Sequence, residues 1–147
     1  GYSAVSVVFL HSYINSDHEL RMRTVLADEC PGIPVCLSCE VLPHYREFER
    51  STTTAVNAYL TPLMGDYLDA LKRGMAERGF RGEPLTMQSN GGVMTVDEAK
   101  RLPARTSRSG PAGGTIAAVR LAEQLGLDDA ILIDIGGTST EVAVRHR

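Results

Sequence analysis

The segment from Ile131 to Val144 constrains the fold most, because an apolar strand runs into a turn of glycines and hydroxyls and then into a second strand. The first strand is predicted to be buried and to contain a single charge, Asp134. Gly136 and Gly137 would allow a sharp turn that brings backbone N–H groups close to an anion. Further residues of this segment are the apolar Ile131, Leu132, Ile133 and Ile135 and the hydroxyl donors Thr138, Ser139 and Thr140.

The turn therefore predicts a phosphate site. Asp134 would face the same anion, which is reasonable if a hydrated Mg²⁺ lies between carboxylate and phosphate. The segment is not a P-loop, since no Gly-x-x-x-x-Gly-Lys-Ser/Thr occurs and the residues after the turn alternate like a strand. The alternative is an ordinary hairpin whose glycines supply positive φ and whose Asp caps the turn.

A family resemblance rests on the residues that precede and form this hairpin. Ser109-Gly-Pro-Ala-Gly-Gly114, followed by Asp134-Ile-Gly-Gly-Thr-Ser-Thr-Glu141, resembles the hydantoinase A/5-oxoprolinase family, whose members carry SGPAGG and DxGGTSTD in this order. Further blocks that resemble the family are Met87–Met94, His11–Glu19, Glu49–Thr54, Asn57–Tyr59 and Pro62. Glu141 departs from the family pattern, which usually has Asp there, so a direct metal role for Glu141 is in doubt.

The resemblance implies an α/β fold of the actin-like ATPase (ribonuclease H-like) type. It further implies an internal fragment that contains the end of one lobe, a connecting helix and the first hairpin of the second lobe. The expected division is residues 1–55 as the C-terminal part of a hydantoinase/oxoprolinase N-terminal domain. Residues 56–147 would open the hydantoinase A/oxoprolinase domain and include its second phosphate loop.

The helix expected after Ser109 would end at Gly126, a C-terminal glycine. It has small residues on one face: Gly113, Gly114, Ala117 and Ala118. Such a face lets another helix cross closely and slide, as a hinge between two lobes requires. The alternative is that the small residues only let the helix pack tightly on its own sheet.

Composition is ordinarily globular, with a formal net charge of −3 and basic residues interleaved with acidic ones. Neither a nucleic-acid surface nor a membrane segment is predicted, and a cytoplasmic enzyme is the expected class.

Periodicity predicts alternating strands and helices. Strands are expected at residues 4–10, 34–41 and 84–88, and helices at 17–30, 53–78 and from Thr95 to Pro103. Two helices would begin with capping boxes, Ser16-Asp-His-Glu19 and Thr95-Val-Asp-Glu98. The long helix would continue through Pro62 with a kink there. It would have a buried apolar stripe formed by Val56, Tyr59, Leu60, Leu63, Met64, Tyr67, Leu68, Leu71 and Met75.

Weaker candidates for function lie outside the hairpin. His11 follows a strand, where open α/β sheets place ligands. The loop Ser89, Asn90, Gly91 and Gly92 offers hydroxyl, amide and unhindered backbone to a ligand, or is a tight turn only. Arg50 with Ser51–Thr54 would bind an anion at a helix N-terminus or supply a helix cap. His18 and Glu19 are expected to be structural, and so are the three thiols Cys30, Cys36 and Cys39, with Cys36 and Cys39 on opposite faces of one strand.

The activity implied by the resemblance is ATP-dependent hydrolysis of a cyclic amide, in which ATP phosphorylates the amide oxygen of a lactam or imide. ATP and Mg²⁺ are the implied cofactors, with the hairpin turn holding the γ-phosphate and Asp134 orienting the metal. A hydantoinase B-like subunit or fused domain is the implied partner, and the 147-residue chain alone is expected to be inactive. The alternatives are an ATP-dependent acetone or acetophenone carboxylase subunit and an actin- or chaperone-like nucleotide switch.

Overall fold

The computed structural model describes residues 1–146, which form two compact units. The first unit comprises residues 1–84 and 96–104, and the second comprises residues 85–95 and the chain from residue 105 onward. The expected domain boundary after residue 55 falls within a continuous helix and remains a prediction. No helix among residues 1–146 is both long and apolar enough to span a bilayer.

The first unit opens with a β-α-β arrangement of β1 (Val5–Val7), α1 (Asp17–Glu29) and β2 (Val35–Leu37). β1 and β2 are parallel, with Val5 opposite Val35. Both strands are shorter than predicted. The chain leaves β2 at Ser38 and forms the one-turn helix α2 (Ser38–Val41), so Cys36 lies on a strand and Cys39 on a helix, not on opposite faces of one strand.

The long helix α3 spans Glu47–Glu77 and passes through Pro62 without interruption, as predicted, but begins six residues earlier than expected. The predicted buried stripe is wrong for most of its members: Tyr59, Leu63 and Tyr67 are 71%, 57% and 59% exposed, whereas Leu68 is buried as predicted. The buried face is mainly polar and contains Arg50, Thr54, Asn57, Ala58 and Leu68.

Asn57 shows why a polar side of α3 faces the rest of this unit. Its amide donates to the carbonyl of Arg101 and accepts from the backbone N–H of Ala104. These bonds secure α4 (Val96–Arg101) and the 3₁₀ turn η1 (Pro103–Thr106). The buried Asn57 side chain thus supplies partners to backbone groups of α4 and η1.

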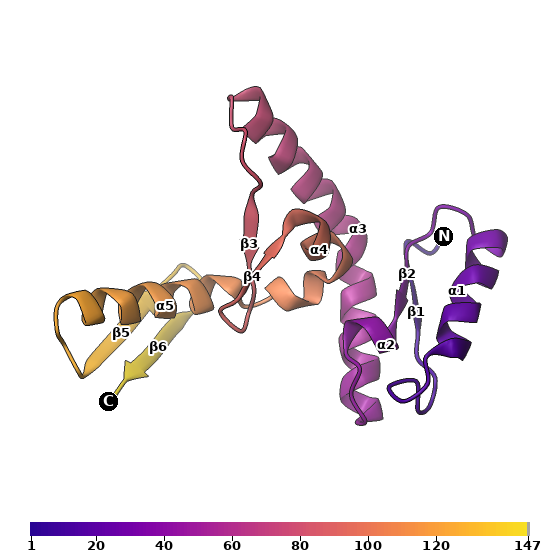
Figure 1. Cartoon of the computed structure of the whole chain (residues 1–147), viewed down its shortest axis with the longest axis horizontal. Coiled ribbons are helices and arrows are strands. Elements are labelled where there is room, and N and C mark those ends of the chain that lie inside the picture. Colours follow the sequence, from indigo (N-terminus) through magenta and orange to yellow (C-terminus); the bar gives the residue numbers. More distant parts are fainter. Residues whose placement is uncertain (147) are drawn as a thin grey trace. The chain divides into compact units, whose positions relative to one another are not determined.

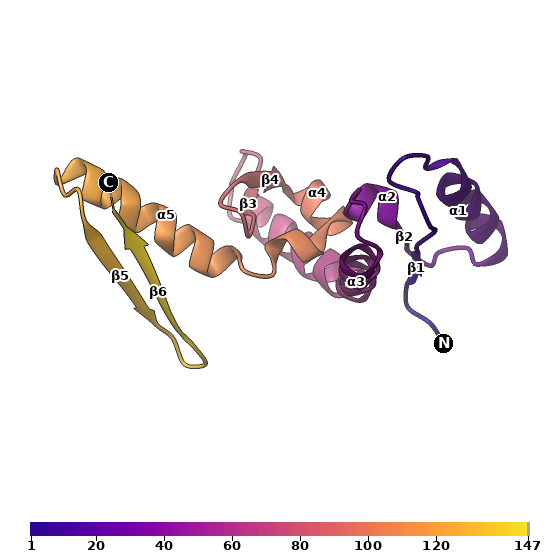
Figure 2. The same ribbon diagram turned by 90° about the horizontal axis from the view of Figure 1, so that it is seen from below.

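The second unit contains two hairpins and one helix (Figure 1). β3 (Leu85–Met87) pairs with β4 (Val93–Thr95), and β5 (Ala130–Ile135) pairs with β6 (Thr140–Arg145), both antiparallel. The helix α5 (Ser109–Gln124) comes between the two hairpins in sequence and lies along the β5–β6 hairpin (Figure 2). α5 ends as predicted before Gly126, whose φ of 68° suits glycine.

The strand-turn-strand prediction for residues 131–144 is confirmed, but burial of the first strand is not. Ile131, Ile133 and Ile135 are 69%, 60% and 75% exposed. In this two-stranded sheet α5 covers one face only, and the alternate residues of β5 point to the other face.

Candidate functional site

The β5–β6 hairpin places Asp134 directly opposite Glu141, and Ile135 opposite Thr140. Cross-strand partners lie on the same face of a sheet, so both carboxylates share one side of the hairpin. Asp134 lies against α5 at its glycine pair: a Cβ added to Gly114 would be 3.8 Å from an Asp134 carboxylate oxygen. A methyl group at position 114 would make only an ordinary contact at this distance, but a longer side chain would meet Asp134 or Leu132.

The glycines of the turn act differently from the prediction. The Gly136 N–H donates to the Ser139 carbonyl at 2.9 Å, so it closes the hairpin and is not free to bind an anion. Neither Gly136 nor Gly137 has positive φ. A Cβ on Gly137 would meet nothing within 4 Å, so the backbone at this position faces open space.

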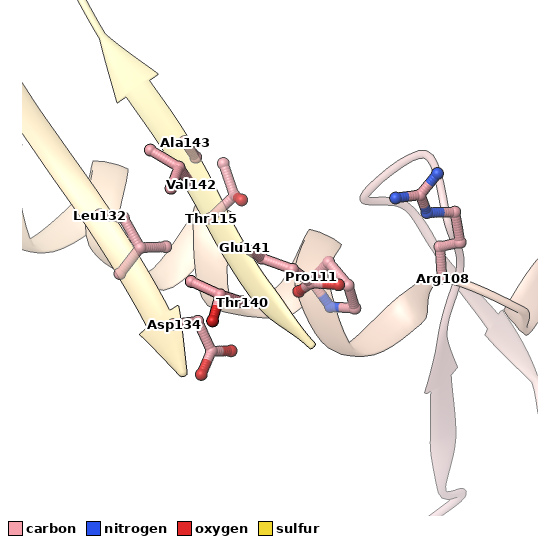
Figure 3. Close-up of a pocket in the computed structure, with 9 residues that line it drawn as sticks. All are labelled: Arg108, Pro111, Thr115, Leu132, Asp134, Thr140, Glu141, Val142 and Ala143. Atoms are coloured by element: carbon pink, nitrogen blue, oxygen red, sulfur yellow. The ribbon is translucent and has the colours of Figure 1, made fainter. Parts of the chain in front are cut away.

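A cavity of about 310 Å³ lies between the hairpin and the start of α5 (Figure 3). Its walls combine two carboxylates, two hydroxyls and one guanidinium with small apolar side chains. The lining residues are Arg108, Pro111, Thr115, Leu132, Asp134, Thr140, Glu141, Val142 and Ala143. Asp134 near the end of β5 and Thr140 at the start of β6 both line this cavity.

The donor set of this cavity fits a magnesium-bound phosphate. Carboxylate oxygens suit Mg²⁺ and its bound water, while hydroxyls and a guanidinium suit phosphate oxygens. Residues 1–146 contain no group of three or more His, Cys, Asp or Glu side chains arranged so that they could hold a metal ion. The predicted magnesium role therefore depends on the Asp134 carboxylate alone, and the nearest cross-strand carboxylate is that of Glu141 on β6.

The Ser89–Gly92 loop belongs to the same unit and is tied to the segment before α5. The Ser89 hydroxyl donates to the Arg105 carbonyl at 2.8 Å and accepts from the Arg108 N–H at 3.0 Å. The Asn90 side chain accepts from the Gly92 N–H. Ser89 and Asn90 thus hold the turn together and attach it next to the N-terminus of α5, and their role towards a ligand stays a prediction.

Gly91 of this loop is required by its conformation and by its neighbour. Its φ is 87°, and a Cβ would stand 2.8 Å from the Cδ1 of Ile116 on α5. The loop therefore packs on the same helix as the β5–β6 hairpin.

The four small residues of α5 do not share one environment. Gly113 faces Met87, Gly114 faces Leu132 and Asp134, and Ala118 lines a small recess against the hairpin. Ala117 is exposed. The hinge remains a prediction, and Ala117 is the position on which it depends.

Two interpretations of the first unit are wrong. Arg50 is fully buried and lies inside α3, where its guanidinium donates to the carbonyls of Phe9 and His44, so it is not an anion site at a helix N-terminus. The hydroxyls of Ser51 and Thr54 donate to carbonyls of the preceding turn and cap nothing.

Glu19 does not close a capping box either, since the N-cap Ser16 makes no side-chain cap bond and the Glu19 carboxylate is fully buried elsewhere. It accepts hydrogen bonds from Phe9, Ser38 and Cys39. No sequence signal distinguishes this buried carboxylate from a capping glutamate, because both stand at the third position of a helix.

The three cysteines are free thiols. Burial, together with the hydrogen bond and charge of Glu19, raises the pKa of the Cys39 thiol to about 12. The thiolate needed for metal binding or redox attack is therefore disfavoured at Cys39.

Comparison with known proteins identifies the family. The hydantoinase/oxoprolinase family model matches residues 50–147, and the chain belongs to this family. The caprolactamase subunit alpha of Pseudomonas jessenii is 35% identical over 96% of this chain and 20% of its own length. The 5-oxoprolinase of Saccharomyces cerevisiae is 34% identical over 97% of this chain and 11% of its own.

Solved structures show the same fold. A nucleotide-free acetone carboxylase structure superposes with a TM-score of 0.85 at 33% identity, over 98% of this chain and 21% of that one. The structure of the ATP-dependent caprolactamase from Pseudomonas jessenii also superposes with a TM-score of 0.85. The identity is 34%, over 97% of this chain and 20% of that one. The α/β fold is thereby confirmed, and the chain spans about a fifth of the length of the first relatives that it matches.

Proposed function

We propose that the protein containing this chain is an ATP-dependent hydrolase of cyclic amides, and that the β5–β6 hairpin supplies part of its phosphate site. The observation that carries the proposal is the placement of Asp134 beside the Gly137–Ser139 turn and against Gly114, at a cavity whose walls suit a magnesium-bound phosphate. The relatives named as a caprolactamase and a 5-oxoprolinase support the substrate class.

The chain's own residues have distinct tasks in this proposal. The exposed backbone at Gly137 and the hydroxyls of Thr138, Ser139 and Thr140 bind the γ-phosphate, and Asp134 orients a magnesium ion through water. Bound ATP would supply the phosphoryl group that converts the amide oxygen into a leaving group. An amide resists water because resonance makes its carbonyl carbon electron-rich, and O-phosphorylation removes that protection.

The actin-like ATPase fold with two closing lobes, a second subunit or fused domain, and a cytoplasmic location belong to the same proposal. Relatives named as subunits of caprolactamase, acetone carboxylase and acetophenone carboxylase support a partner subunit. We also expect the 147-residue chain alone not to hydrolyse ATP, because Asp134 and the turn residues are exposed to water, which weakens every electrostatic contact with a phosphate. Phosphate release by the isolated chain at the rate of the full-length protein would contradict this.

A second candidate is ATP-dependent carboxylation of a ketone, supported by a superposition on acetone carboxylase that is as close as the one on caprolactamase. A third, an actin- or chaperone-like nucleotide switch, would use the same phosphate hairpin without an organic substrate. The phosphate site proposed at the hairpin is compatible with all three candidate functions.

A substrate screen of the full-length protein tests the proposal. Phosphate release from ATP is measured with 5-oxoproline, hydantoin and caprolactam, with acetone plus bicarbonate, and with ATP alone. Release that depends on one of the cyclic amides supports the proposal. Release that needs ketone and bicarbonate, or that needs no added compound, replaces it with the second or third candidate.

A further inference from the structure

Two fully buried charged residues of the first unit hold the same backbone residue. The Glu19 carboxylate accepts from the Phe9 N–H at 2.8 Å, and the Arg50 guanidinium donates to the Phe9 carbonyl at 2.7 Å. Both side chains are 0% exposed, although Glu19 lies on α1 and Arg50 on α3. Phe9 is thus fixed from two separate helices.

Each of these residues also holds a second segment. Glu19 accepts from the Ser38 hydroxyl at 2.6 Å and from the Cys39 N–H at 2.9 Å, at the end of β2. Arg50 donates to the His44 carbonyl at 3.2 Å, and its guanidinium lies 5.5 Å from the centre of the Tyr13 ring. The loop after β1 is therefore bound to the loop after β2 and to α3.

This arrangement is a costly way to stabilise a fold. Among the described residues Glu19 and Arg50 form no ion pair with each other, and the Nε of Arg50 is buried without a hydrogen-bond partner. Removing charges from water is unfavourable, and apolar side chains of similar size often fill such places at no loss of stability. What the two charges provide is a fixed backbone between Phe9 and Tyr13.

His11 stands in the middle of that loop. It is the one non-glycine residue with positive φ among residues 1–146, at 57°, a conformation that is disfavoured for a side chain with a Cβ. Its side chain is exposed and forms no hydrogen bond within residues 1–146, while its ring lies 6.2 Å from that of Tyr13. A strained backbone that buried charges hold in place, with an unengaged imidazole at its tip, is the pattern of a preorganised binding residue.

The position agrees with this interpretation. His11 follows β1, and β1 and β2 are parallel, so the loops after both strands meet at the carboxyl edge of the pair. The Ser12 and Ser38 hydroxyls form a buried hydrogen bond at 3.0 Å where they meet. Ligands of open α/β sheets bind at this edge.

We propose that His11 is a substrate-contacting residue whose imidazole forms a hydrogen bond with the organic substrate, and that Glu19 and Arg50 are positioning residues that act through it. The inference rests on the proposed function, since it takes the organic substrate to be a carbonyl compound of that reaction.

The decisive variant is His11→Gly in the full-length protein. Glycine accepts positive φ without strain, so the melting temperature is expected to stay within a few degrees of the wild-type value or to rise. kcat/KM for the organic substrate should fall roughly 10-fold, the loss of one hydrogen bond, while the affinity for ATP measured by calorimetry is unchanged. His18→Ala, an exposed histidine on α1, is the matched control and should retain full activity.

A double-mutant cycle separates positioning from general stability. Glu19→Gln keeps the shape of the side chain, but its amide cannot accept all three hydrogen bonds, so both kcat/KM and melting temperature should fall. In the His11→Gly background Glu19→Gln should still lower the melting temperature but cost little further kcat/KM, because the residue through which it acts is gone.

The outcomes are distinct. Wild-type protein that turns over no carbonyl compound overturns the proposed function and this inference with it. Active wild type with an equally active His11→Gly overturns the inference alone, since the conformation is kept and only the imidazole is lost. Additive losses in the double mutant overturn the positioning role of Glu19 and leave a structural one.

Discussion

Glu19 in the first unit and Asp134 in the second are both carboxylates beside a turn, but their surroundings are opposite. Glu19 is fully buried and accepts three hydrogen bonds, two of them from backbone N–H groups. Asp134 is exposed at the cavity beside Gly114, and no ion pair engages it within residues 1–146. The Glu19 carboxylate uses its oxygens to bind backbone and hydroxyl groups of its own unit, whereas the Asp134 carboxylate is available to a ligand.

Because of these opposite surroundings, substitutions of the two carboxylates should affect stability and function separately. A buried carboxylate cannot be changed without loss of the structure that it holds, because its partners would be left unsatisfied. An exposed carboxylate on a regular hairpin contributes little to folding, so its removal should be felt only in ligand binding or turnover.

The largest expected effect comes from Asp134→Asn in the full-length protein. The amide is nearly isosteric but lacks the charge that anchors magnesium through water, so we expect magnesium-dependent turnover to fall on the order of 10- to 100-fold, with the melting temperature nearly unchanged. Phosphate release at several Mg²⁺ concentrations measures it. Glu123→Gln, which removes an exposed carboxylate of α5, is the control. An unchanged rate at saturating Mg²⁺ would remove Asp134 from the site.

Gly91→Ala tests whether the second unit also contains a firmly fixed loop. Both the positive φ and the 2.8 Å approach to Ile116 oppose a Cβ, so we expect a loss of roughly 1 to 3 kcal/mol in the free energy of unfolding. Gly79 has a similar φ of 84°, but a Cβ there would have no neighbour within 4 Å. Gly79→Ala therefore measures the part of the loss that comes from backbone strain alone. Equal losses in the two variants, measured by denaturant titration, would show that Ile116 moves aside freely.

Ala117→Leu and Gly114→Leu test the hinge against simple packing. Leucine at 114 must displace Leu132 or Asp134, with an overpacking cost of roughly 1 to 3 kcal/mol, whereas position 117 is exposed in this unit. If Ala117 faces a crossing helix in the full-length protein, turnover should fall several-fold with little change in melting temperature. A large drop in melting temperature with full activity of the folded fraction would mean that the helix only packs.

The smallest effect concerns acid stability of the first unit. Burial raises the pKa of Glu19, but hydrogen bonds from Ser38, Cys39 and Phe9 outweigh it and hold this pKa below the ordinary 4.5. The stability that ionised Glu19 contributes is therefore complete above pH 4.5 and is lost as the pH falls through the lower folded-state pKa. Melting temperatures of wild type and Glu19→Gln between pH 3 and 7 should converge towards the acid end. Parallel curves would contradict the assignment.

The sequence by itself determined the local elements and the family. The alternation around Asp134 and the turn glycines predicted the β5–β6 hairpin, and Gly126 marked the end of α5, because hairpins and helix ends depend on neighbouring residues. The motifs at Ser109–Gly114 and Asp134–Glu141 carried the family resemblance, which the matching family model confirmed.

Only the tertiary structure decided which side chains are buried and what they hold. Most of the apolar stripe of α3 is exposed, while Arg50 and Asn57 of the same helix are buried. Glu19 looked like a helix cap and instead binds the loop after β1, and Gly136 looked like an anion donor and instead closes its own turn. Burial depends on which distant segments cover a face and which backbone groups need partners, and such long-range pairing leaves no trace in a local pattern.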